Sequence, residues 1–383
     1  MKTLSIAIIL LLLLLTQSVS SFAKIPPKAR QILYKAQLLM DNERFKEAAD
    51  VIKKYMNSTS ETIDAQVYLT LGGCLNQAGD EKNAYSVFKQ GFQKYPEDEI
   101  LCRNTAVAAY ELEKFDESGK LLEKAYTLQK KPDPKILFQS GSMYYQGEDF
   151  KNSARVMLKL ISSVKNPEKE WILLTIHSLL ADRQIAKTKS ILLKYLASTP
   201  EDAAYWQLLA KLNMEKDQMS EAAAALEIAY RLKQPSQSEL LNLAAIYRYE
   251  EAPLLAAKVL QRAYGKNINS KQALKISALY ASAGRITEAI KYLDLYTVNG
   301  TTLLKKGKLL FTARKFKQAE NTFKKCLGSK EANEARFYLA LCAWEQKEWS
   351  RARKELLKIT DITIKKRSSG YLDILREIEK IQL

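Results

Sequence analysis

The chain has 383 residues, more than one compact hydrophobic core usually organises, so either several domains or an array of repeats is expected. Hydrophobic residues make up 47% and charged residues 27%, as in a folded globular protein, and only 13 Gly and 9 Pro argue against long disordered linkers and frequent tight turns. The formal net charge of +17 points to anionic partners, although a solvated basic exterior explains it at least as well.

The first 23 residues have the three regions of a secretory signal peptide. Lys2 supplies the positive start, residues 4–15 form an apolar run, and residues 21–23 (Ser-Phe-Ala) offer a cleavage site before Lys24. An uncleaved anchor is the alternative, but the apolar run is shorter than the ~20 residues of a spanning helix. We therefore expect residues 1–23 to be a cleaved signal peptide, no later transmembrane segment, and a periplasmic or secreted product without nucleic-acid partners.

A repeat of about 34 residues fills the mature chain. Its clearest copy begins at Ala65 and reads Tyr68-x2-Leu71-Gly72-x2-Leu75, then Gly79-Asp80, Ala84-x3-Phe88 and Pro96. Related units start near residues 29, 65, 99, 134, 169, 203, 237, 270, 300 and 333. This spacing predicts about ten units of two helices each between residues 24 and 367.

Small residues recur at the eighth and twentieth positions of these units. Nine of the ten eighth positions hold Gly, Ala or Ser, the exception being Ile176, and all ten twentieth positions hold Ala, Ser or Thr. Two antiparallel helices approach most closely where neither carries a bulky side chain. The larger apolar residues between these positions follow the i, i+3, i+4, i+7 spacing of a buried helical stripe. The two small positions therefore predict where the helices of a unit cross.

This pattern resembles the tetratricopeptide repeat (TPR), whose unit has an aromatic-x2-Leu-Gly-x2-Tyr first helix, an Ala-x3-Phe second helix and a terminal proline. The resemblance implies an all-α fold, a right-handed TPR α-solenoid of about ten helix-turn-helix repeats. Residues 368–383, with Leu372, Leu375 and Ile378 apolar, are expected to form a C-terminal capping helix. The fifth unit, with Ile176 and Thr188 at its small positions, and the shortened eighth unit are where a kink is expected.

The sequence offers no catalytic or metal-binding constellation. Every Ser-His or Cys-His arrangement would need the single histidine, His177, which has no evident orienting acid. The four cysteines lack C-x-x-C spacing and histidine partners, and the repeat register separates them by more than the ~7 Å between Cα atoms that a disulfide allows. These are Cys74, Cys102, Cys326 and Cys342. We expect reduced thiols, no enzymatic activity, no catalytic residues, no metal and no cofactor.

The resemblance also implies a binding surface. In the family the first helices line a concave face that binds extended or helical peptide segments. Aromatic anchors beside cations on that face would suit an amphipathic, partly acidic segment. Transferring the inner positions to this chain gives the candidate partner-binding residues Arg103, Tyr110, Phe138, Tyr145, Lys211, Arg248, Phe311 and Trp344. An equally weighted alternative is that the aromatic residues pack between neighbouring first helices.

These observations favour a non-enzymatic periplasmic scaffold or adaptor that binds a partner protein. A signal peptide followed by about ten degenerate repeats is similar to exported tetratricopeptide proteins that accompany TonB-type energy-transduction systems. That similarity implies an inner-membrane TonB-type complex as a partner. The alternative function is a cell-envelope assembly factor whose basic surface binds anionic glycans or lipids.

Overall fold

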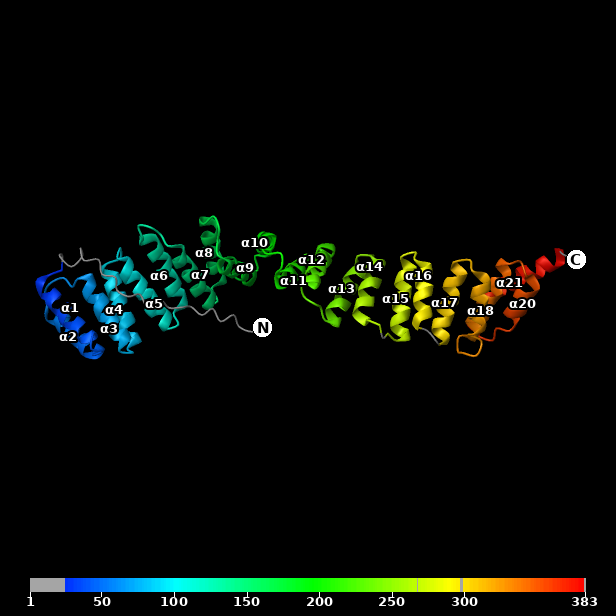
Figure 1. The fold of residues 1–383 in the computed structure, drawn as a ribbon, viewed down its shortest axis with the longest axis horizontal. Helices are drawn as coiled ribbons and strands as arrows, with labels where there is room; N and C mark the ends of the chain where they lie inside the picture. Colours follow the sequence, from blue (N-terminus) through cyan, green and yellow to red (C-terminus); the bar gives the residue numbers. More distant parts are fainter. Residues whose placement is uncertain (1–24, 267, 297–298, 382–383) are drawn as a thin grey trace. The chain divides into compact units, whose positions relative to one another are not determined.

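The computed structural model describes residues 25–266, 268–296 and 299–381, and the predicted signal peptide lies outside them. The described residues form 21 α-helices and no β-strand (Figure 1). They divide into two compact parts, one ending at Tyr195 and one beginning at Leu196. The predicted fold class, an all-α solenoid of paired helices, is confirmed.

The N-terminal part contains five helix pairs, in which the odd-numbered helix is the first helix of a unit and the even-numbered helix is the second. Their bounds are α1 (Pro27–Met40), α2 (Phe45–Ser58), α3 (Ala65–Gln77), α4 (Glu81–Lys94), α5 (Glu99–Glu111), α6 (Phe115–Leu128), α7 (Pro134–Gln146), α8 (Phe150–Ser163), α9 (Lys169–Ala181) and α10 (Ile185–Ser198). The division between the two parts falls in α10, the second helix of the least regular unit.

The C-terminal part contains five further pairs and one terminal helix. Their bounds are α11 (Ala203–Met214), α12 (Met219–Leu232), α13 (Gln237–Tyr249), α14 (Pro253–Tyr264), α15 (Ser270–Ser282), α16 (Ile286–Tyr296), α17 (Gly300–Thr312), α18 (Phe316–Lys324), α19 (Ala332–Glu345), α20 (Trp349–Leu357) and α21 (Ile362–Ile381). All ten first helices begin within two residues of the unit starts read from the sequence.

The terminal helix α21 begins six residues before the predicted start at Ser368. Asp361 provides the earlier start, because its carboxylate accepts a hydrogen bond from the backbone N–H of Ile364 at 2.9 Å. A side chain that satisfies a free N–H in the first turn is a favourable N-cap. Residues 368–381 of the predicted capping segment are therefore the later portion of a longer helix.

The same turn joins the two helices in all ten units. The fifteenth residue of each unit has a positive φ, and the next N–H donates to the carbonyl five residues earlier at 2.8–2.9 Å, as Lys114 does to Ala109. This is the Schellman arrangement that ends many helices. Glycine, which adopts positive φ without steric cost, occupies the position only at Gly79 and Gly284, whereas eight units hold a charged residue there.

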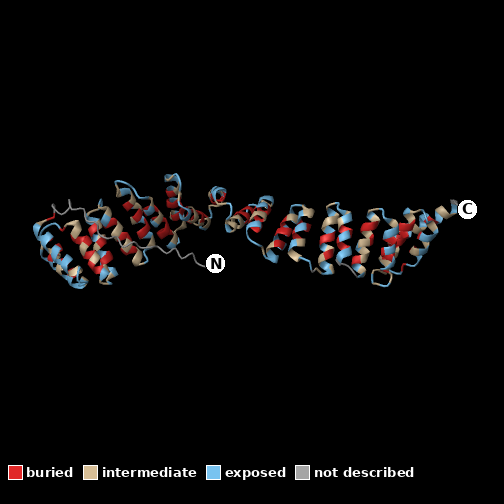
Figure 2. Cartoon of the chain, in the orientation of Figure 1, coloured by how far each residue is buried: buried red, intermediate tan, exposed pale blue. Residues whose placement is uncertain are grey.

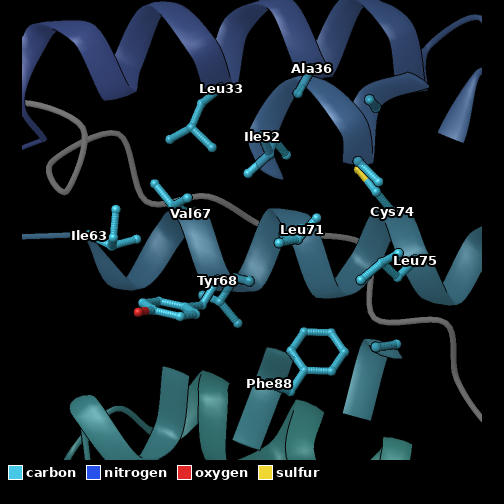
Figure 3. Packing of buried hydrophobic residues seen from close by; sticks show 14 of the residues in the cluster. Leu33, Ala36, Ile52, Ile63, Val67, Tyr68, Leu71, Cys74, Leu75 and Phe88 are labelled. Atoms are coloured by element: carbon cyan, nitrogen blue, oxygen red, sulfur yellow. The ribbon is translucent and has the colours of Figure 1, made fainter. Parts of the chain in front are cut away.

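The helices of a unit cross at the predicted small positions, which are buried in every unit. A Cβ added to Gly72 would overlap the ring of Phe88, which is labelled in Figure 3. Gly141 and Gly307 stand in the same relation to Met157 and Phe323. Each of these large residues is the twenty-fourth of its unit. Where the eighth residue is alanine, the twenty-fourth is only Ile or Leu, as in the Ala36 and Ile52 pair. The two positions are therefore matched in size.

Figure 2 shows the buried residues gathered where neighbouring helices meet. Three hydroxyls cross between the two helices of a unit in this core. Ser118 donates to the carbonyl of Ala106 at 2.8 Å, and Ser153 and Ser277 make the same kind of bond to Gly141 and Ala289 at 2.8 and 3.0 Å. Since the hydroxyls are satisfied by these bonds, serine is tolerated at a crossing that holds alanine or glycine in most other units.

Polar side chains connect neighbouring units. The hydroxyl of Tyr144 on α7 donates to Glu123 on α6 at 2.9 Å, and Arg155 on α8 donates twice to the same carboxylate at 2.6 and 2.8 Å. Tyr280 and Gln261 repeat the first of these bonds at equivalent positions, at 3.1 Å. Burial alone would raise the pKa of Glu123, but its bonds to Arg155 and Tyr144 outweigh burial and lower it. The carboxylate therefore stays ionised between the units.

Candidate functional site

First helices lie closer to one another than second helices do. In the N-terminal part α1 contacts α3, α3 contacts α5 and α7 contacts α9, and in the C-terminal part α15, α17, α19 and α21 form a similar series. No pair of second helices makes comparable contacts over the residues that the structure covers. The first helices therefore form the inner row of each part, where the candidate binding residues were predicted.

Four candidate residues lie on the inner row of the N-terminal part, and all four are half-buried. The Tyr110 ring lies 6.0 Å from that of Phe115, and the Tyr145 ring lies 5.3 Å from that of Phe150, edge to face. Arg103 pairs with Glu99, one turn earlier on α5, at 3.3 Å. Both tyrosines therefore have a packing contact within their own unit.

The fourth of these residues, Phe138 on α7, stacks on Trp171 of α9 with ring centroids 6.3 Å apart. Because α7 and α9 are first helices of adjacent units, this contact is the packing alternative expected from the sequence. Trp171 is buried, so Phe138 offers a partner only the part of its ring that faces away from it.

The other four candidates lie in the C-terminal part. Lys211 on α11 and Arg248 in the last turn of α13 are exposed. Phe311 lies 5.5 Å from Phe316, and Trp344 lies 5.4 Å from Trp349. The structure thus places the two cations in solvent and gives the two aromatic residues packing partners.

A single rule relates four of these ring contacts. Tyr110, Tyr145, Phe311 and Trp344 each lie five residues before the ring that they contact. Each partner is the first residue of the second helix, so the pair spans the Schellman turn. The i, i+5 spacing is readable in the sequence, but its meaning requires the turn geometry. These rings therefore help to close their helix pairs.

In the C-terminal part the ring contacts continue across three inner helices. Phe311 lies 5.7 Å from Tyr338, Phe337 lies 5.8 Å from both Tyr338 and Tyr371, and Tyr371 lies 5.3 Å from Trp344. Phe337 is buried, whereas Phe311, Tyr338, Trp344 and Tyr371 are half-buried, and we name these four the aromatic surface. Tyr338 and Tyr371 were not among the predicted site residues. The sequence does not show that α21 continues the inner row, so it gave no sign that Tyr371 lies beside Trp344.

Two cations lie over rings of this region and share one carboxylate. The Nζ of Lys308 is 4.8 Å from the centre of the Tyr338 ring and 2.7 Å from Glu334. The Arg367 guanidinium is 4.0 Å from the centre of the Phe337 ring and 2.8 Å from Glu334. Burial would raise the pKa of Glu334, but its bonds to Lys308 and Arg367 outweigh burial and lower it. Two positive charges therefore flank one negative charge beside the rings.

The reactive side chains of the described residues are dispersed. No group of three or more His, Cys, Asp or Glu residues is placed to hold a metal ion in the part of the chain that the structure covers. All four cysteines are buried free thiols, and burial raises the pKa to about 11 for Cys74 and Cys326 and to about 12 for Cys102 and Cys342. Such thiols are protonated and unreactive near neutral pH.

His177 on α9 is half-buried, and burial lowers its pKa.

None of the helices within the described ranges is both long and apolar enough to cross a bilayer.

Comparison with known proteins supports the same architecture. Residues 304–364 match the family model described as tetratricopeptide repeat. The structure of Naa15/Naa10 bound to HypK-THB is similar with a TM-score of 0.50 and 13% identity, covering 87% of this chain. The chain spans 58% of that protein, and at 13% identity the likeness shows the fold alone. Comparison with curated proteins gave no match.

Two further solved structures are less similar. A tetratricopeptide repeat protein from Parabacteroides merdae has a TM-score of 0.35 and 14% identity, covering 67% of this chain and 98% of that one. Yeast Tom70 has a TM-score of 0.32 and 13% identity, covering 93% and 97%. The family match falls on α17–α20, and the turn found there recurs in every other unit. Residues 304–364 therefore match the tetratricopeptide-repeat family, and the other units of the chain share their helix-pair architecture.

Proposed function

We propose that this chain is a non-enzymatic scaffold that binds a segment of a partner protein along its inner row of first helices. The observation that carries the proposal is the aromatic surface, whose rings on α17, α19 and α21 are all partly exposed. Lys308 lies over its Tyr338 ring, and Arg367 lies over the adjoining buried ring of Phe337. Aromatic and arginine side chains supply most of the binding energy at protein interfaces. The favoured partner segment is amphipathic, with apolar side chains for the rings and acidic ones for the cations.

The proposed location is the periplasm, and the predicted signal peptide supports export. We further propose that the partner belongs to the cell envelope, with an inner-membrane TonB-type complex as the specific candidate. The similarity in overall organisation to exported tetratricopeptide proteins is the support for that partner.

Site-specific crosslinking in intact cells tests the scaffold proposal. A photo-reactive amino acid replaces Thr312, which is exposed beside Phe311 on α17, and in a matched variant it replaces Asn321, which is exposed on the second helix α18. We expect position 312 to crosslink to a defined polypeptide that mass spectrometry identifies, and position 321 not to. Equal crosslinking from both positions, or crosslinking from 321 alone, would contradict binding along the inner row.

A further inference from the structure

The turn between α20 and α21 exposes two large aliphatic side chains. Leu357, the last residue of α20, is 65% exposed, and Ile362, the first residue of α21, is 85% exposed. Ile362 is the most exposed large apolar residue in the described chain. The two residues are five positions apart, so their Cα atoms lie at most about 18 Å from each other. An aliphatic pair this exposed has no role in the packing of the helices.

Exposed lysines flank this pair on the same helix faces. Lys354 precedes Leu357 by three residues on α20, and Lys365 and Lys366 follow Ile362 by three and four residues on α21. Residues at these spacings are neighbours on a helix surface. None of the three lysines has an ion pair within the described residues. We name Lys354, Leu357, Ile362, Lys365 and Lys366 the C-terminal tip.

The nearby acids offset only part of this charge. Glu355 pairs with Lys358 at 2.8 Å and with Arg336 at 3.1 Å, and Asp361 accepts the N-cap hydrogen bond of α21. Residues 300–383 contain twenty Lys and Arg residues and ten Asp and Glu residues. The net charge of this segment, which contains the tip, is therefore more than half of the net charge of the whole chain.

We propose that the C-terminal tip docks on the surface of an anionic lipid bilayer. In this arrangement Leu357 and Ile362 enter the boundary between headgroups and acyl chains, while the three lysines contact lipid phosphates. Exposed aliphatic side chains flanked by lysines are the chemistry of reversible membrane-surface binding, which combines apolar burial with attraction to anionic headgroups. A soluble polyanion would use the lysines but would leave the aliphatic side chains in water. The occupant that fits both groups is a bilayer.

The tip differs from an interface for a protein partner in its composition. Protein interfaces favour aromatic anchors that fill pockets. The tip has two exposed aliphatic residues at the two ends of one turn and no aromatic residue. The aromatic surface of the same part lies on the inner row of first helices, so the bilayer site and the proposed partner site use different side chains.

Sedimentation with vesicles tests the docking. The mature full chain is mixed with vesicles of phosphatidylcholine alone or of phosphatidylcholine with phosphatidylglycerol. We expect binding only to the anionic vesicles, and a loss of at least about tenfold in the partition coefficient for both L357S/I362S and K365E/K366E. The matched control L232S/K233E changes an exposed aliphatic residue and a lysine at the end of α12, and it should bind as the unaltered chain does.

Environment-sensitive fluorescence separates insertion from simple adsorption. The substitution Ile362→Cys allows an NBD dye to be attached at the tip, and the four native thiols are buried and stay unlabelled. We expect a blue shift and stronger emission with anionic vesicles and no change with phosphatidylcholine or heparin. Circular dichroism of each variant checks that the helices are retained.

Three results would overturn the proposal. Vesicle binding that survives L357S/I362S but not K365E/K366E would show a polyanion site. An NBD spectrum that is unchanged by anionic vesicles would show that the tip does not insert. Equal losses in the tip variants and in L232S/K233E would show nonspecific attraction to the whole basic surface.

Discussion

At the scale of single residues, this protein is organised by the matching of size where two helices cross. The sequence indicated that the eighth position must be small, and Gly72 lies there against the ring of Phe88. It did not show that the twenty-fourth residue is the partner, because that depends on the angle between the helices. Gly73, the next residue of α3, has open space where a Cβ would be. Of these two adjacent glycines of one helix, Gly73 has room for a larger side chain and Gly72 does not.

We predict that Gly72→Ala lowers the free energy of unfolding by about 1–3 kcal/mol, because the added methyl group overlaps the Phe88 ring. Adding Phe88→Leu should recover part of the loss, since leucine faces alanine at this crossing in other units. Urea unfolding followed by circular dichroism measures both. Gly73→Ala is the control and should be neutral or stabilising, because alanine is the better helix former. Equal losses for the two glycines would show that the crossing is elsewhere.

His177 gives a second prediction at this scale. Burial lowers its pKa below the ordinary value of about 6.5 that it has when unfolded. Between these two values the unfolded chain binds more protons than the folded chain, so stability falls as the pH falls through this window. The variant His177→Gln should therefore lose less stability than the unaltered chain between about pH 7 and the lowered pKa. Parallel melting temperatures for the two proteins across that range would contradict this assignment.

At the scale of elements, the recurring unit is a helix pair closed by one turn. Its helix starts were predictable from the small positions and the prolines. The turn was less visible, because Glu113 and seven other charged residues adopt the positive φ that the sequence signals only at Gly79 and Gly284. Two kinds of local interaction could not be predicted from the sequence alone. The i, i+5 ring pairs require knowledge of the turn, and the early start of α21 depends on the cap by Asp361.

The turn has the same backbone geometry in each unit. At the fifteenth residue of a unit, replacing glycine should therefore lower the free energy of unfolding, whereas introducing glycine should not. Gly79→Ala places a Cβ at φ +78° and should lower the free energy of unfolding by about 1 kcal/mol. Glu113→Gly removes a Cβ at φ +57° and should leave stability unchanged or raise it slightly. Thermal unfolding of both variants measures the difference. A larger loss for Glu113→Gly than for Gly79→Ala would show that the glutamate side chain, and not the backbone, stabilises the turn.

At the scale of the whole molecule, periodicity predicted the fold class and the approximate number of units. The fifth unit, with Ile176 and Thr188 at its small positions, was expected to hold a kink, but the division into two compact parts that falls there was not predicted. The proposed partner site is harder to predict for a physical reason. A half-buried ring on a first helix, such as Phe138 or Trp344, packs against one neighbour and remains available to another. Sequence spacing does not separate these two roles.

The most direct test of the scaffold account compares the two tryptophans of one ring pair. Trp344 and Trp349 lie 5.4 Å apart, but only Trp344 is on a first helix and contacts Tyr371. Trp344→Ala and Trp349→Ala should both lower the melting temperature, because each removes the same ring contact. Capture of the partner identified by crosslinking at position 312 should fall with Trp344→Ala, by at least about tenfold in affinity, and be retained with Trp349→Ala. Equal loss of capture in both variants, or capture unchanged in both, would contradict binding by the inner row.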